Sequence, residues 1–192
     1  MTAKNILMFG PPGAGKGTQA KLLKDLINVP HISTGDMFRD NIKNNTDLGK
    51  RAQEYSSQGK LVPDEVTIAM VKDRLQRDDV KGGFLLDGFP RSVPQAEALD
   101  GILSGLGASV DAVVNISVSD DEIRARLSKR ADIEGRADDA DPSVIQNRID
   151  TYKSQSEPCL EFYQPKEVVK NVDGIGTIEE IAERIAGLFK EP

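Results

Sequence analysis

Cysteine is nearly absent from this 192-residue chain, which contains a single one, Cys159. One cysteine cannot form an intrachain disulfide, and it excludes a zinc site built from several cysteines. A reducing compartment suits such a chain, so we predict a cytoplasmic protein. Cys159 itself is interpreted as a small packing residue, and a reactive thiol is the alternative.

Long apolar runs and an excess of positive charge are lacking as well. No stretch approaches the ~20 consecutive apolar residues of a membrane-spanning helix. The first apolar run, Ile6 to Phe9, leads into a glycine-rich loop instead of forming a secretory segment. The net charge of -6 argues against general nucleic-acid binding, which needs a basic face. We therefore expect neither a membrane nor a nucleic acid as partner, and any affinity for phosphate must come from locally placed cations.

Histidine is also scarce, since His31 is the only one. It stands in a short predicted strand, where packing or hydrogen bonding is favoured over catalysis. The chain shows no repeat or low-complexity tract. Its length suits one domain, 1–192, with a small inserted lobe, and 38% apolar residues suffice for a full core.

The first twenty residues carry the strongest motif. A short apolar run breaks at Gly10, and a helical pattern begins at Lys16, so that Gly10, Gly15 and Lys16 fit the phosphate-binding loop G-x-x-x-x-G-K. Glycines let backbone N–H groups turn inward around an anion, and the helix N-terminus adds its dipole. An ordinary strand-turn-helix corner is the alternative. Here Gly17 stands between the lysine and Thr18, whereas the general motif has Ser or Thr directly after the lysine.

Strands and helices alternate along the whole chain, which predicts an α/β protein with a parallel sheet covered on both faces. Strands are expected at 6–9, 31–33, 84–87, 112–118 and 168–172. Helices are expected from 16 to 26, as two short ones within 36–58, and at 65–77, 93–103, 120–130, 142–154 and 178–189. Gly35 or Asp36 is expected to open the second helix, and Asp64 to cap the helix that begins at Glu65.

Asp87 follows the apolar run Phe84-Leu85-Leu86. Ligands of open α/β sheets bind at the carboxyl ends of the strands, so Asp87 could hold Mg²⁺, directly or through water, beside the phosphate loop. A capping role in the following turn is the alternative. Further along, Arg126 and Arg130 share one helical face. The stretch from Ala131 to Asp141 is acidic and predicted to be an exposed excursion.

Together these residues resemble an adenylate kinase over nearly the whole chain. The anchors are Gly10 to Thr18, Ser33-Thr34-Gly35-Asp36-Met37, Asp87-Gly88-Phe89-Pro90-Arg91 with Gln95, and the arginines from Arg126 to Arg148. The insertion of Gly17 before Thr18 is itself the pattern of nucleoside monophosphate (NMP) kinases. The resemblance implies an α/β P-loop three-layer fold with a parallel five-stranded sheet, an inserted helical NMP-binding lobe at 33–62 and a short lid at 130–142.

The resemblance also implies reversible transfer of a phosphoryl group from Mg-ATP to AMP, giving two ADP. The implied catalytic residues are Lys16, Arg91, Arg126, Arg136 and Arg148. The implied ATP-binding residues are Gly13, Ala14, Gly15, Lys16, Gly17, Thr18, Arg126, Arg130 and Gly176. The implied AMP-binding residues are Thr34, Gly35, Arg39, Lys60, Leu61, Val62, Gly88, Phe89, Pro90, Arg91, Gln95, Arg136 and Arg148. Any single arginine among these could instead be a solvated or ion-paired surface residue.

Uridylate–cytidylate kinases share the phosphate loop and the Asp-Gly-Phe-Pro-Arg run, so the acceptor base needs its own argument. The Gln95 amide can donate to a ring nitrogen of adenine and accept from its exocyclic amine. Thr34 also matches the adenylate enzymes, whereas pyrimidine-specific relatives usually have Ala. Both favour AMP.

The short lid contains no cysteine, so the resemblance implies Mg²⁺ as the metal and no structural zinc. We expect lid and lobe to close over the nucleotides and exclude water. A nucleotide-dependent switch is a competing class, but the guanine motif N-K-x-D of GTPases is absent. Nothing in the sequence suggests an obligate oligomer, so a monomer is expected.

Overall fold

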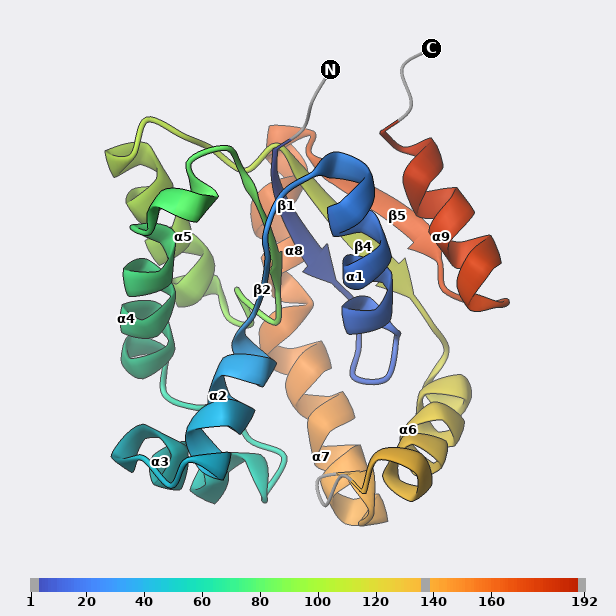
Figure 1. Cartoon of the computed structure of the whole chain (residues 1–192). Coiled ribbons are helices and arrows are strands. Elements are labelled where there is room, and N and C mark those ends of the chain that lie inside the picture. Colours follow the sequence, from blue (N-terminus) through green and yellow to red (C-terminus); the bar gives the residue numbers. More distant parts are fainter. Residues whose placement is uncertain (1–3, 136–138, 190–192) are drawn as a thin grey trace.

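A five-stranded, all-parallel sheet forms the centre of the molecule in the computed structural model, which describes residues 4–135 and 139–189 (Figure 1). The strands are β1 (Asn5–Phe9), β2 (His31–Ser33), β3 (Phe84–Asp87), β4 (Ala112–Ser117) and β5 (Val169–Asp173). Their order is β2-β3-β1-β4-β5, and every neighbouring pair is parallel. The predicted fold class and sheet are therefore confirmed.

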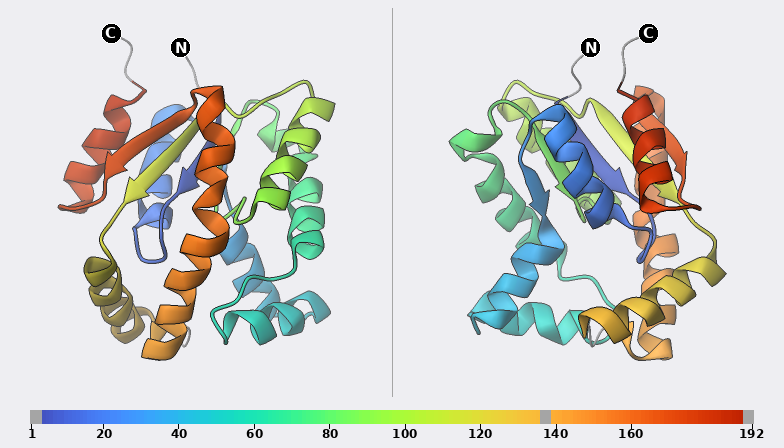
Figure 2. Two further views of the ribbon diagram at one scale, coloured as in Figure 1. Left: turned by 180° about the vertical axis from the view of Figure 1, so that it is seen from behind. Right: turned by 45° about the vertical axis from the view of Figure 1, so that its right-hand side comes forward.

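Helices cover both faces of this sheet. The α-helices are α1 (Lys16–Ile27), α2 (Thr34–Lys43), α3 (Asp47–Ser56), α4 (Asp64–Leu75), α5 (Val93–Gly105), α6 (Asp120–Glu134), α7 (Pro142–Thr151), α8 (Pro158–Tyr163) and α9 (Ile178–Gly187). A π-helical turn, Tyr152–Ser156, joins α7 to α8, and short 3₁₀ turns occur at Asp78–Val80 and Gln164–Lys166. In Figure 2, α8 lies in front of the sheet in the view from behind, whereas α1 and α9 lie in front of it in the other view.

The alternation of strand residues explains the three layers. Leu7 and Phe9 of β1 belong to a cluster with residues of α4, α5 and α8, whereas Ile6 and Met8 point to the opposite face and pack with α1 and α9. A parallel strand buried on both sides reads as a continuous apolar run, as the sequence 6–9 does. A third, smaller cluster joins α6 to α7.

Cys159 lies in the first of these clusters and is fully buried. Burial raises the pKa of its thiol to about 12, so the thiol stays protonated at neutral pH. The thiolate is the reactive form of cysteine. The structure therefore supports a packing role for Cys159.

Helix starts follow side-chain capping, with two departures from expectation. Helix α2 begins at Thr34, one residue before the expected start, because the Ser33 side chain accepts a hydrogen bond from the Asp36 backbone N–H. The N-cap of α4 is Pro63, and Asp64 already belongs to the first turn. The sequence predicts Asp64 as the cap of this helix, but its carboxylate instead accepts hydrogen bonds from Ser92, the N-cap of α5, and from Gln95 in the first turn of α5.

The acidic segment after α6 also differs from expectation. Helix α6 continues to Glu134, so part of the predicted excursion is helical. Asp139, expected to be exposed, is only 1% exposed. Residues 136–138, with the implied catalytic Arg136, lie outside the described residues.

Candidate active site

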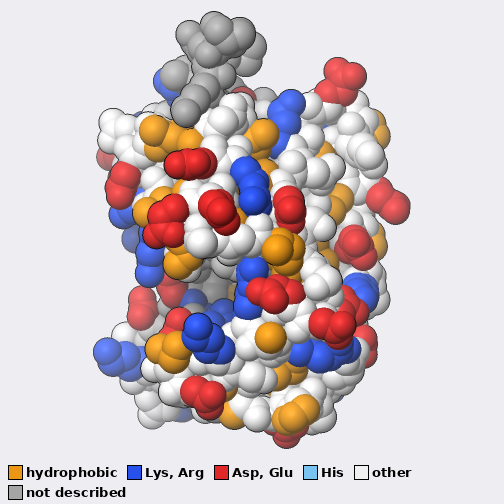
Figure 3. Space-filling view, turned by 90° about the vertical axis from the view of Figure 1, so that its right-hand side faces the viewer, with side chains coloured by type: hydrophobic (Ala, Val, Ile, Leu, Met, Phe, Trp, Pro, Cys, Tyr) orange, Lys and Arg blue, Asp and Glu red, His pale blue; other side chains and the backbone are white. Residues whose placement is uncertain are grey.

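A cleft of about 930 Å³ opens at the carboxyl ends of β1 and β3. That volume lies in the upper part of the range for small-molecule sites. The phosphate loop, α2, α6 and α7 all contribute to its walls. In the space-filling view of Figure 3, Lys and Arg side chains gather around a recess between the larger and the smaller part of this face. The cleft thus lies where parallel α/β sheets bind ligands.

The phosphate loop between β1 and α1 depends on glycine at three positions, the first of which is Gly10, with a φ angle of 146°. Gly13 and Gly15 adopt φ angles of 78° and 91°, which side-chain-bearing residues rarely adopt. Lys16 begins α1, and its Nζ donates hydrogen bonds to the carbonyl oxygens of Gly10 (2.8 Å) and Pro11 (2.9 Å). The lysine therefore folds back over the loop, where an anion held by the loop N–H groups would lie next to its ammonium group.

The pKa of Lys16 depends on its burial and on the charged side chains around it. Burial lowers the pKa of its ammonium group to about 7, Asp87 opposes this shift, and Arg91, Arg148 and Arg130 add to it. These cations come from α6, α7 and the segment after β3, so the fold brings them close enough to repel one another. A site in which four cations lie this close together is suited to a polyanion.

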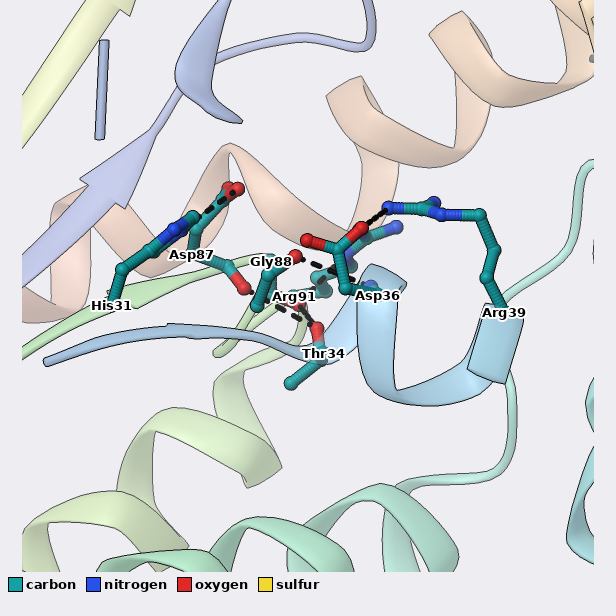
Figure 4. A network of polar contacts seen from close by, with 8 residues as sticks. His31, Thr34, Asp36, Arg39, Asp87, Gly88 and Arg91 are labelled. Atoms are coloured by element: carbon teal, nitrogen blue, oxygen red, sulfur yellow. Dashed lines mark hydrogen bonds and ion pairs between the residues drawn. The ribbon is translucent and has the colours of Figure 1, made fainter. Parts of the chain in front are cut away.

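At the end of β3, polar contacts connect Asp87 and Gly88 to β2 and α2 (Figure 4). The Thr34 hydroxyl donates to the carbonyl oxygen of Gly88 over 2.8 Å, and Arg91 Nε donates to the same oxygen over 2.8 Å. His31 Nε2 is buried, has no hydrogen-bond partner among the described residues and lies 3.7 Å from Asp87 Oδ2. His31 therefore lies next to Asp87, a residue of the cleft wall, which its position in a short strand did not indicate.

Asp87 is suited to hold a magnesium ion. Its carboxylate faces the cleft, and a Cβ placed on Gly17 would lie 3.6 Å from Asp87 Oδ2, so the carboxylate lies against the phosphate loop. Among residues 4–135 and 139–189, no group of three or more His, Cys, Asp or Glu side chains could hold a metal. Mg²⁺ needs no such group, because one or two carboxylates, water and substrate phosphates commonly complete its shell.

On the α2 side, Arg39 pairs with Asp36 (Figure 4). Burial alone would raise the pKa of the Asp36 carboxyl, but the hydrogen bond and the charge of Arg39, together with the Ser33 hydroxyl and His31, hold the pKa below the usual value. Both side chains line the cleft. Arg39 is thus oriented at the cleft wall.

On the α6 and α7 side, Asp139 holds two arginines together. Its carboxylate is completely buried and accepts hydrogen bonds from Arg130 and Arg148. Arg126 is anchored separately, to Glu122 (2.7 Å) and to the carbonyl oxygen of Gly174 (2.8 Å). Sequence reasoning identified the arginines but missed Asp139, because an acidic stretch gave no sign that one carboxylate would be enclosed by two guanidinium groups.

Gln95 is 2% exposed and lies at the cleft on the first turn of α5. Its Oε1 accepts a hydrogen bond from the backbone N–H of Arg91, and its Nε2 donates to Asp64 Oδ1, each over 2.8 Å. These two bonds hold the side-chain amide in one orientation.

Most of the expected site residues line this cleft. They are Gly13, Gly15, Lys16, Gly17, Thr18, Thr34, Gly35, Arg39, Lys60, Leu61, Val62, Asp87, Gly88, Pro90, Arg91, Gln95, Arg126, Arg130 and Arg148. Ala14 and Phe89 are buried beside it, each 1% exposed. Gly176, in the turn before α9, is not part of the cleft wall. The wall also includes residues that the sequence analysis did not single out, among them Lys129, Ile133, Tyr152 and Ser156.

A parallel sheet, a glycine loop before a helix and a converging set of cations define the class of phosphate-loop nucleotide-binding proteins. No described helix is long and apolar enough to cross a bilayer.

Comparison with known proteins narrows this class. The family model described as adenylate kinase matches residues 8–168. An adenylate kinase of Thermobifida fusca is 47% identical over 185 residues, which cover 96% of this chain and 97% of the relative. The adenylate kinase of Kocuria rhizophila is 50% identical over an alignment that covers 94% of this chain and 95% of the relative. The adenylate kinase of Mycobacterium sp. (strain MCS) is also 50% identical, over 93% of this chain and 95% of the relative. The chain belongs to the adenylate kinase family, as the sequence motifs predicted.

Proposed function

We propose that this protein catalyses the reversible transfer of the γ-phosphoryl group of Mg-ATP to AMP, giving two ADP. The observation that carries the proposal is the convergence of Lys16, Arg91, Arg130 and Arg148 on one cleft. Phosphoryl transfer needs little covalent chemistry, but it needs two phosphate groups in line and cations around the moving group. The names of the relatives agree with this activity.

The donor side of the cleft is the phosphate loop. Backbone N–H groups from Gly13 to Thr18 would surround the ATP phosphates, and Lys16 would turn from the loop carbonyls towards them. Arg126 and Arg130, on one face of α6, would hold the donor from the opposite side. The resemblance also assigns ATP contacts to Ala14 and Gly176, but burial of Ala14 and the place of Gly176 outside the cleft give these two no further support.

The acceptor side is formed by α2 and the segment after β3. Arg39 and Arg91 would bind the AMP phosphate, and Arg148 would approach the transferred group from α7. Thr34, Gln95 and the backbone at 60–62 would surround the adenine and ribose. The resemblance also implies a role for Arg136, which lies outside the described residues.

Asp87 would hold Mg²⁺ through water beside the phosphate loop. The ion, when bound, would neutralise charge on the ATP phosphates and help to align them. We further propose that the lobe at 33–62 and the lid at 130–142 close over both nucleotides. Closure would keep water away from the phosphoryl group and so prevent hydrolysis of ATP.

The proposal is tested by a coupled assay for ADP, with ATP, Mg²⁺ and a panel of AMP, CMP and UMP. We expect product only when a monophosphate is present, with AMP as the best acceptor. A preference for CMP or UMP would make the protein a pyrimidine nucleotide kinase of the same fold. Hydrolysis of ATP without any acceptor would indicate a nucleotide switch.

Two further expectations need separate tests. Gel filtration tests whether the protein is a monomer, and fractionation of cells tests whether it is cytoplasmic.

A further inference from the structure

Asp64 joins the two segments that border the acceptor side of the cleft. It is the first residue of α4 and directly follows the cleft-lining segment 60–62 and Pro63. Its Oδ1 accepts hydrogen bonds from two residues at the start of α5, from the Ser92 hydroxyl over 2.9 Å and from Gln95 Nε2 over 2.8 Å. Helices α4 and α5 lie side by side (Figure 1). The carboxylate thus bridges them next to the cleft.

The chemistry of the two partners of Gln95 permits one orientation of its amide. A carboxylate oxygen only accepts hydrogen bonds, so the NH₂ group of Gln95 must face Asp64. The backbone N–H of Arg91 only donates, so the carbonyl oxygen of Gln95 must face that group. Rotating the amide by half a turn would set two donors against each other at Arg91 and two acceptors against each other at Asp64. At a site that is 2% exposed, water cannot relieve either conflict.

With the amide held in this way, one N–H and one carbonyl lone pair of Gln95 are available to a ligand. This pair complements adenine, in which N1 accepts and the N6 amine donates. Hypoxanthine presents the reverse, because its N1–H donates and its O6 accepts. A rotated amide would therefore suit hypoxanthine, and the fixed one suits adenine.

We propose that Asp64 is a positioning residue that sets the acceptor-base specificity of this enzyme, by holding Gln95 in the orientation that accepts adenine and rejects a 6-oxopurine. The inference rests on the proposed function, in which Gln95 contacts the acceptor base. Asp64 acts through Gln95 and does not touch the nucleotide.

The test compares AMP with inosine monophosphate as acceptor. Asp64→Ala removes the oxygen that excludes the rotated amide, so the ratio of kcat/KM for AMP to that for inosine monophosphate should fall by about tenfold or more. The KM for ATP should stay within about twofold, because the change acts only at the acceptor base. Should Asp64→Ala fail to fold, Asp64→Asn keeps the shape but offers both a donor and an acceptor, and it should also lower the ratio.

Ser92→Ala is the matched control. It removes the other hydrogen bond to the same Asp64 oxygen and also the N-cap of α5, but it leaves the two partners of the Gln95 amide in place. Its ratio should equal that of the unaltered protein even if its stability falls. An unchanged ratio in the Asp64 variants, or an equal loss in Ser92→Ala, overturns the inference.

Gln95→Leu separates this inference from the function on which it rests. If Gln95→Leu abolishes the preference for AMP over inosine monophosphate while the Asp64 variants keep it, Gln95 contacts the base but Asp64 does not position it. If Gln95→Leu itself keeps the preference, the assignment of Gln95 to the acceptor base fails.

Discussion

Lys16 illustrates, at the scale of a residue, how its surroundings decide what a side chain can do. A lysine ammonium ordinarily has a pKa near 10.5, but burial and three neighbouring arginines lower the pKa of Lys16 to about 7. The lysine is thus poised between its neutral and charged forms in the nucleotide-free protein. An anion bound in the phosphate loop would favour the charged form and raise the pKa again.

This shift predicts proton uptake when ATP binds. At pH 8 Lys16 is mostly neutral in the free protein, and the phosphates of ATP are fully ionised, so binding should take up about one proton. Since Lys16 carries the extra proton when ATP is bound, the affinity for ATP should fall as the pH rises above about 7. Calorimetric titration in two buffers of different ionisation heat measures the uptake. The control Lys16→Arg keeps a permanent positive charge, so its binding of ATP should take up no proton at this position. If the heat of ATP binding to the unaltered protein is the same in both buffers, the prediction is contradicted.

Arg91 supplies a second prediction at this scale. If its guanidinium group binds the AMP phosphate and orients it for attack, Arg91→Ala should lower kcat at least a hundredfold, since catalytic arginines of phosphoryl transfer contribute roughly 10³–10⁵. The fold should survive, because the Gly88 carbonyl that accepts from Arg91 also accepts from Thr34. Circular dichroism and steady-state rates measure both. The control is Arg77→Ala, which removes an ion-paired arginine two residues after the end of α4 and outside the cleft, and it should keep normal turnover. Near-normal turnover of Arg91→Ala would refute the assignment.

At the scale of an element, the pair α2–α3 depends on one close backbone contact. Helix α3 crosses α2 at Gly49, where an added Cβ would lie 2.2 Å from the Asn41 carbonyl oxygen and 2.6 Å from the Ile42 nitrogen. Backbone atoms cannot move aside as the end of a flexible side chain does. Only glycine lets the two helices approach this closely, and their approach shapes the wall that carries Arg39.

Gly49→Ala should therefore force α2 and α3 apart. We expect a loss of about 1–3 kcal/mol in the free energy of unfolding, as for other overpacked sites. In the proposed function the KM for AMP should also rise more than the KM for ATP. Urea denaturation and steady-state kinetics measure the two effects. The control is Gly101→Ala in α5, where no atom lies within 4 Å of the new Cβ, and it should be neutral or stabilising by about 1 kcal/mol. Equal free energies of unfolding for the two variants would contradict the prediction.

At the scale of the whole molecule, two helical arms extend from the same side of the sheet, beyond the carboxyl ends of its strands (Figure 1). One arm is α2–α3, and the other is α6 with the start of α7. Helix α7 contacts the loop that follows α3, where Thr151 Oγ1 donates to the Gly59 carbonyl oxygen over 3.3 Å. An apolar cluster of α6 and α7 holds the second arm together. The sheet and the helices on its two faces form the larger hydrophobic clusters, so relative motion is expected at the arms.

We predict that crystal structures with and without a bisubstrate nucleotide differ mainly in the segments 33–62 and 130–142. The cations on the two sides of the cleft repel one another until phosphates lie between them, so binding should draw the arms together. Superposition on the five strands measures the displacement of each segment. Two structures that superpose throughout as one rigid body would rule out closure.

Local patterns explain what could be predicted from the sequence. The phosphate loop and its glycines, the position of Asp87 after an apolar strand and the alternation of strands and helices all depend on neighbours in the chain. The side-chain caps at Ser33 and Ser92 are also local, although the sequence patterns did not identify either residue as a cap. The family resemblance extended this to the arginines, although it could not show which of them share a partner.

The remaining features depend on residues that are distant in sequence. Asp64 acts on Gln95, 31 positions away, instead of capping its own helix. Asp139 is buried between arginines of α6 and α7, although its own surroundings in the sequence are acidic and polar. The glycine loop after β1 and the alternation of strands and helices depend on residues that are close in sequence, so the sequence predicts them. The strand order, the burial of a carboxylate and the pKa of Lys16 exist only once folding has brought remote charges and surfaces together.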